Sequence, residues 1–107
     1  MTTFDKREAA FENKFAHDAE RDFKITVRRN KLLGAWAAGL MGLGGEEAEA
    51  YAKTVVQADF IEVGDDDVIG KVMTDLAVAG VPVTDADIRR MLADKTEEAR
   101  QQIASAT

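Results

Sequence analysis

The sequence predicts an all-α protein: a four-helix bundle-like domain preceded by a mobile amphipathic N-terminal arm. Apolar residues recur at helical spacing along almost the whole chain, and no window shows a sustained alternation of period two. Breaks that contain glycine or proline, near residues 44, 64 and 80, divide this pattern. The 107 residues suit one small domain. We therefore expect an arm at residues 1–20 and a helical bundle at residues 21–107.

The first segment carries four of the five phenylalanines, namely Phe4, Phe11, Phe15 and Phe23. On a helical wheel the first three fall within about 40° of one another, but the next two positions on that line are Asp18 and Asp22. The apolar face then resumes in a shifted phase, as the inner side of the first bundle helix: Phe23, Val27, Leu33, Trp36, Ala37 and Leu40. We expect no buried face to be shared across this boundary, although one continuous helix is compatible with the pattern.

Three more helices follow the breaks. The second begins after Gly44 and Gly45 and ends near Gly64. The run of acids at residues 65–67 complements the dipole at the start of the third helix, which ends at Gly80. Thr84 and Asp87 resemble a capping box that begins the fourth helix. The stripes expected to face the core are Ala48, Tyr51, Ala52, Val55, Val56 and Phe60, then Val68, Ile69, Val72, Met73, Leu76 and Ala79, then Ile88, Met91, Leu92, Ala99 and Ile103.

Composition excludes several classes of function. A net charge of −6 opposes binding to a polyphosphate backbone, so we expect no nucleic-acid partner. The chain has no cysteine, one histidine (His17) and one serine (Ser105), which leaves no nucleophile and base pair, and we expect no catalytic residue, no metal site and no enzyme. Residues 64–67, GDDD, lack the alternating oxygens of an EF-hand loop. The longest apolar run, 32–45, is too short for a bilayer span, and the N-terminus lacks a signal-peptide run, so we expect a cytoplasmic protein without direct membrane insertion.

A group of four cations is the first candidate for binding. Lys24, Arg28, Arg29 and Lys31, which we call the basic cluster, lie inside eight residues of an acidic chain. Lys24 and Arg28 are i, i+4 neighbours on one helical face. The cluster is either an ordinary solvated face or a site for weak binding of ATP or ADP.

The arm is the second candidate, and insertion into a groove of another protein fits it best. It does not continue the bundle stripe, and residues 4–24 hold five cations against six anions, so an anionic membrane offers no electrostatic gain. In a protein groove, Phe4, Phe11 and Phe15 would be the anchors at i, i+7 and i+11. Arg7 and Lys14 would then be among the charges that meet the polar rim of that groove.

Four strings in register, FENKFAHDAE, RRNKLLGAWAA, YAKTVVQADF and GDDDVIGKV, resemble the ATPase inhibitor subunit zeta family of the alphaproteobacterial F-type ATP synthase. The resemblance runs nearly from end to end. It implies that the segment matching residues 1 to about 19 folds into a helix and enters a catalytic interface of the alpha and beta subunits, against the gamma subunit, and so blocks ATP hydrolysis. It also implies weak binding of adenine nucleotide and association with the inner-membrane synthase through its catalytic head. We expect a monomer when the protein is free.

The alternative interpretation, from another class, is a small helical module that binds or senses ATP or ADP through the basic cluster. The chain also departs from the family pattern at Gly34, Ala35 and Gly39, where larger helix-forming residues are usual. Each interior glycine costs up to about 1 kcal/mol relative to alanine. We therefore expect the first bundle helix to be less stable than in other members.

Overall fold

A computed structural model of the chain contains four α-helices in the residues that it describes, 2–61 and 64–106, with side chains described for 18–60 and 64–106. The helices are α1 (Thr2–Leu40), α2 (Gly45–Ile61), α3 (Asp65–Val78) and α4 (Asp85–Ala106). These ranges contain no strand, which confirms the all-α class. The arm and the first bundle helix belong to one helix, α1, and the functional division near residue 20 stays a prediction.

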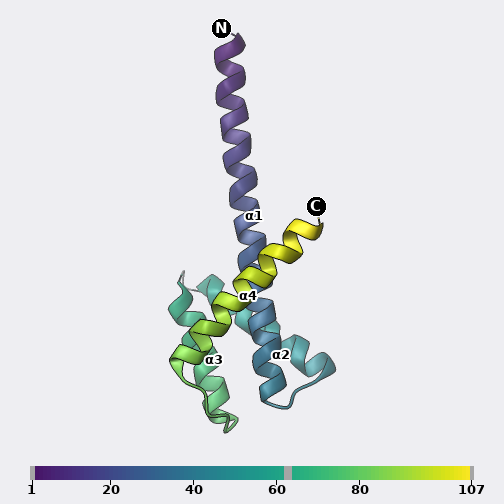
Figure 1. The fold of residues 1–107 in the computed structure, drawn as a ribbon, viewed down its shortest axis with the longest axis vertical. Helices are drawn as coiled ribbons and strands as arrows, with labels where there is room; N and C mark the ends of the chain where they lie inside the picture. The colour runs from purple at the N-terminus through teal and green to yellow at the C-terminus, as the bar shows by residue number, and fades with distance from the viewer. Residues whose placement is uncertain (1, 62–63, 107) are drawn as a thin grey trace.

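α1 is the central element of the fold. Its C-terminal half packs mainly against α2 and α4, and α3 closes the core between them. Figure 1 shows α4 crossing α1 obliquely, with the C-terminus beside the middle of α1, while the N-terminal half of α1 extends beyond the other three helices. Within the described residues, no helix is long and apolar enough to cross a membrane.

The core confirms most of the predicted apolar stripes. All four helices contribute to one cluster of buried side chains: Leu33, Ala37, Val55, Val68, Ile69, Val72, Leu76, Ile88 and Leu92. Trp36, Tyr51, Met73 and Met91 pack against this cluster while remaining partly exposed. At about 25 cal/mol per Å² of buried apolar area, such a cluster is the main source of stability in a domain of this size.

Four residues predicted for the core are exposed instead. Phe23 and Phe60 are 54% and 60% exposed, Leu40 is 43% exposed, and Ala79 lies on the surface. Each lies at or near the end of the buried part of its helix, where the neighbouring helices no longer cover it. The helical spacing predicts the correct face, but it does not predict how far along that face the neighbours extend.

Gly34 lies at a close approach of α1 to α2. A Cβ atom at this position would lie 2.7 Å from the Cα atom of Ala52 and 3.1 Å from its Cβ atom, well inside normal contact distance. The glycine therefore allows the two backbones to pack together, and the expectation that it only weakens α1 was incomplete. Gly39, by contrast, faces open space.

The helix ends follow the predicted signals. Gly42 and Gly80 both have a φ of 79°, the left-handed conformation in which α1 and α3 are terminated. The predicted capping box is confirmed: the Thr84 backbone N–H donates to Asp87 Oδ2 at 3.0 Å, and the Asp87 N–H donates to Thr84 Oγ1 at 3.1 Å. These hydrogen bonds hold the pKa of Asp87 below its usual value, and the bond from the Thr84 backbone has the largest effect.

Gly34→Ala should destabilise the protein by about 1 to 3 kcal/mol, because the added methyl group forces α1 and α2 apart. Gly70→Ala is the matched control: Gly70 lies inside α3 and a Cβ there meets nothing within 4 Å. The control should stabilise the protein by about 0.5 to 1 kcal/mol through helix propensity alone. Urea unfolding monitored by circular dichroism measures both, and equal effects of the same sign would refute the close-packing role of Gly34.

Candidate functional site

The structure divides the basic cluster into two parts. Lys24, Arg28 and Lys31 are exposed, whereas Arg29 is only 8% exposed. Residues 28 and 29 are separated by about 100° around a helix, which is why one can lie in solvent and the other inside the fold. The cluster therefore presents three cations, and the fourth has a different set of contacts.

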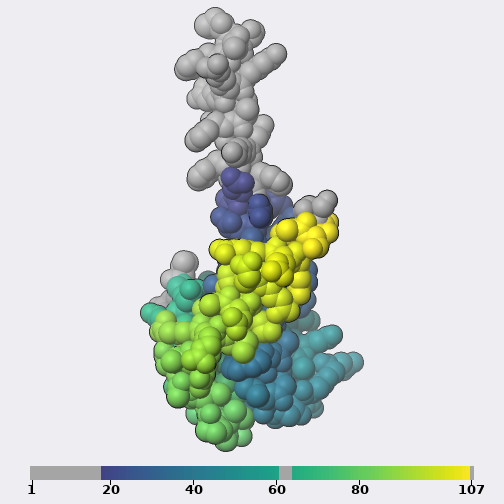
Figure 2. Space-filling view, viewed as in Figure 1, coloured from purple at the N-terminus to yellow at the C-terminus, as the bar shows by residue number. Residues whose placement is uncertain are grey.

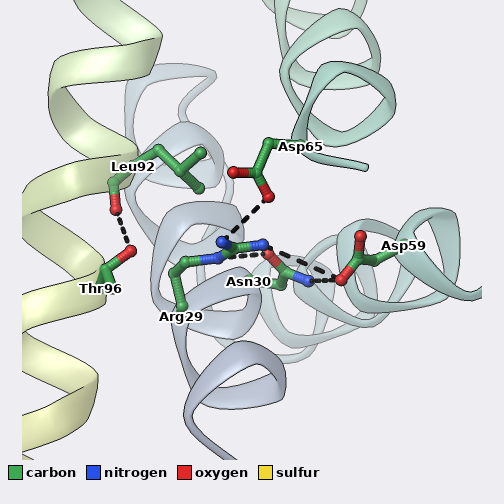
Figure 3. A network of polar contacts seen from close by, with 6 residues as sticks. All are labelled: Arg29, Asn30, Asp59, Asp65, Leu92 and Thr96. Atoms are coloured by element: carbon green, nitrogen blue, oxygen red, sulfur yellow. Dashed lines mark hydrogen bonds and ion pairs between the residues drawn. The ribbon is translucent and has the colours of Figure 1, made fainter. Parts of the chain in front are cut away.

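Arg29 is the centre of a polar network that joins α1, α2 and α3 (Figure 3). Its Nε donates to Asn30 Oδ1 at 3.1 Å, and Asn30 Nδ2 donates to Asp59 Oδ2 at 3.1 Å. Its Nη1 lies 3.1 Å from Asp65 Oδ1, and its Nη2 lies 3.9 Å from Asp59 Oδ2. A charge this far inside a protein is stable only when it is paired and hydrogen-bonded, and Arg29 meets both conditions.

This network fixes the neighbouring helix ends. Asp59 lies in the last turn of α2 and Asp65 is the first residue of α3, so one guanidinium contacts both sides of the α2–α3 connection. On the next residue, Asp66 Oδ1 lies 3.0 Å from Arg89 Nη2 of α4. The acids that the sequence predicts as a helix start therefore also pair with cations of α1 and α4, which the sequence does not reveal.

A second polar group links α2 to α3. The Tyr51 hydroxyl donates to Asp75 Oδ2 at 2.8 Å, and Lys71 Nζ lies 2.8 Å from the same oxygen. Burial, and then the hydrogen bond to Asp75, raise the pKa of Tyr51 far above its usual value, so the phenol stays protonated. The arrangement holds α2 and α3 together.

The three exposed cations line a shallow groove of about 340 Å³ that we call the basic groove, with Phe23, Val27 and Ile103 as its other lining residues. Lys24 Nζ lies 3.4 Å from Glu20, and Arg28 Nη1 donates to Gln102 Oε1 of α4 at 3.2 Å. Lys31 has no ion-pair partner among the described side chains. The structure thus brings Lys24, Arg28 and Lys31 together beside an exposed aromatic ring and leaves Arg29 out.

A second groove, of about 290 Å³, lies between α1 and α2 on the other side of Phe23. The rings of Phe23 and Phe60 border it, with their centroids 5.9 Å apart. We call it the aromatic groove, and its lining residues are Asp22, Phe23, Thr26, Val27, Asn30, Val56, Asp59 and Phe60. The sequence does not predict this groove, because the helical spacing places both phenylalanines in the core.

The predicted partner-binding residues of the arm lie outside the described side chains: Phe4, Arg7, Phe11, Lys14 and Phe15. Description of the side chains begins at residue 18, and residues 18–24 are all exposed. In the space-filling view, this part of α1 remains visible above α4 (Figure 2). Ile25 is the first described residue of α1 that is buried, so residues 21–24, which follow the arm, lie outside the core.

Comparison with known proteins identifies a family and a similar fold. The sequence model of the family described as ATPase inhibitor subunit zeta matches residues 1–102. A protein whose structure was determined by NMR in solution is 40% identical, with a TM-score of 0.70, over 79% of this chain and 96% of that chain. A search of curated proteins found no match. The family match includes the arm, the basic cluster and both grooves, apart from Ile103.

Arg29→Ala should destabilise the protein by about 2 to 4 kcal/mol, because it leaves Asn30 and the largely buried Asp59 without their charged donor. Arg28→Ala removes the same chemical group from the preceding, exposed position and should change stability by less than about 0.5 kcal/mol. Thermal unfolding of the two variants gives the comparison. Equal losses would mean that the Arg29 network contributes no more than a surface hydrogen bond.

Proposed function

The chain belongs to the ATPase inhibitor subunit zeta family, and on this premise we propose that it inhibits ATP hydrolysis by the F-type ATP synthase without catalysing a reaction itself. The arm would insert as a helix into a catalytic interface of the alpha and beta subunits, against the gamma subunit of the rotary head. The observation that carries this proposal is that the family match begins at residue 1 and so includes the arm together with the bundle.

The direction of α1 supports separate roles for the arm and the bundle. The helix is packed between α2 and α4 in its C-terminal half and continues towards its N-terminus beyond the other helices (Figure 1). The exposure of residues 18–24 indicates that the bundle does not need them for its core. A partner can therefore bind the segment before residue 18 without opening the folded domain.

Simple energetics favour an arm that acts only when tethered to a bundle. Burial of three phenylalanines contributes roughly 5 to 9 kcal/mol, whereas ordering some fifteen residues costs on the order of 1 kcal/mol or more each. The arm alone should bind poorly. If the bundle also contacts the ATPase head, it raises the effective concentration of the arm, and inhibition becomes tight.

Phe11→Ala and Phe15→Ala should each weaken inhibition by about 1 to 3 kcal/mol, because each removes apolar area that is buried only in the complex. The melting temperature should stay nearly unchanged. Deletion of residues 2–19 should abolish inhibition. The measurement is the ATP hydrolysis rate of a purified F-type ATPase from the same source, titrated with each variant.

Asn13→Ala is the control for the arm, since position 13 lies opposite the phenylalanine line on a helical wheel. It should inhibit like the unmodified protein. Two results would contradict the proposal: unchanged hydrolysis at micromolar concentrations of the unmodified protein, or full inhibition by the deletion variant.

The basic groove favours a second, weaker activity, which is binding of ATP or ADP. Lys24, Arg28 and Lys31 can neutralise phosphate oxygens, and the exposed ring of Phe23 offers a surface on which a base can stack. Arg29 is occupied by Asp59 and Asp65, so this proposal relies on the other three cations of the basic cluster.

Lys24→Ala or Arg28→Ala should weaken ATP and ADP binding alike, because the cations recognise the phosphates and not the base. Lys53→Ala, which removes an exposed cation of α2, is the control and should leave binding unchanged. Chemical-shift titration in the millimolar range is sensitive enough. If saturating nucleotide moves no resonance near residues 24–31, the basic groove is a solvated face.

A further inference from the structure

The aromatic groove is an apolar surface that the folded domain leaves uncovered. Phe23 and Phe60 are both more than half exposed although their rings contact each other, so each would gain further burial from a partner. Exposed aromatic side chains that flank a groove are typical of binding hot spots, since they bury a large area at a low cost in conformational entropy.

The charges of the groove indicate what kind of partner fits. Asp22 and Asp59 are the two charged residues that line it. Asp59 is already bound by Arg29 and Asn30, whereas Asp22 is exposed and has no ion-pair partner within the described residues. An apolar side chain flanked by Lys or Arg would satisfy both the rings and the free carboxylate. A nucleotide would bring negative charge to Asp22 instead, and the same groove of a second copy would bring that copy's own Asp22.

The position of the groove on α1 connects it with the arm. On a helical wheel, Asp22 and Thr26 of the groove fall within about 60° of the line of Phe4, Phe11 and Phe15. The basic groove lies on the opposite side of Phe23. A protein that holds the phenylalanine face of the arm is therefore on the correct side of α1 to reach the aromatic groove as well.

We propose that the aromatic groove is the surface through which the bundle docks on the ATPase, where it receives an apolar side chain from a basic segment of the catalytic head. This inference rests on the proposed function, because it supplies the second contact that makes the tethered arm effective. The arm then blocks hydrolysis, and the contact at the aromatic groove slows dissociation of the protein from the ATPase.

Phe60→Ala in the full-length protein should weaken inhibition about tenfold and speed dissociation from the ATPase, with little change in melting temperature because the side chain is already 60% exposed. Asp22→Asn keeps the shape of the groove and should weaken binding severalfold at low salt, with a smaller effect at high salt. Val78→Ala is the matched control, since Val78 is an apolar residue of α3 that is 84% exposed and does not line the groove.

Inhibition by Phe60→Ala and Asp22→Asn at the strength of the unmodified protein would overturn the docking surface while leaving the arm mechanism intact. Failure of the unmodified protein to inhibit would overturn the proposed function and the docking surface together. Sedimentation that shows a dimer dissociated by Phe60→Ala would identify a second copy as the occupant and refute the proposal. ATP binding that is lost in Asp22→Asn or Phe60→Ala but kept in Lys24→Ala would identify a nucleotide as the occupant of the aromatic groove and refute the proposal.

Discussion

The arrangement of the helices depends on one buried guanidinium. Arg29 holds the last turn of α2 through Asp59 and the first residue of α3 through Asp65, and Asn30 completes its hydrogen bonds. Hydrophobic burial favours collapse but is non-directional, so it does not specify where one helix ends against another. The planar fork of donors on an arginine does specify such a position. In a domain with a small core, these directional contacts tie the connection between α2 and α3 to α1.

The sequence predicts the elements of this fold better than their contacts. Glycine breaks, the acids at residues 65–67 and the Thr84–Asp87 capping box act within a few residues, so the helix ends can be located from the local pattern. The burial of Arg29 cannot be inferred in this way, because a cation among other cations is normally solvated and its acidic partners lie about 30 or more residues further along the chain. The grooves escape prediction for a related reason. Whether Phe23 and Phe60 are covered depends on where α2 and α4 stop, which is a property of the assembled bundle.

α1 carries most of the residues on which function is proposed to depend. Its inner side supplies Ile25, Leu33 and Ala37 to the core, and its close contact with α2 at Gly34 holds it firmly in place. Its outer side separates charges of opposite sign, with Asp22 on one flank of Phe23 and the exposed lysines on the other. An acidic protein thereby offers a local positive surface and a local negative one within a few turns of a single helix. Such a division allows two ligands of opposite charge to be recognised on different flanks of α1, although both grooves share Phe23 and Val27.

Because α1 is one continuous helix, the number of residues before the bundle sets the direction in which the N-terminal segment faces. Residues 18–24 are all exposed, yet they connect the folded domain to everything before them. Each residue of a helix adds roughly 1.5 Å of rise and about 100° of rotation. Loss or gain of one residue there would hardly change the reach of the N-terminal segment, but it would turn that segment to a different side. Only insertions or deletions close to a whole number of turns, such as about seven residues, keep its orientation. The number of residues in this exposed stretch therefore matters more for the direction in which the N-terminal segment faces than for its reach.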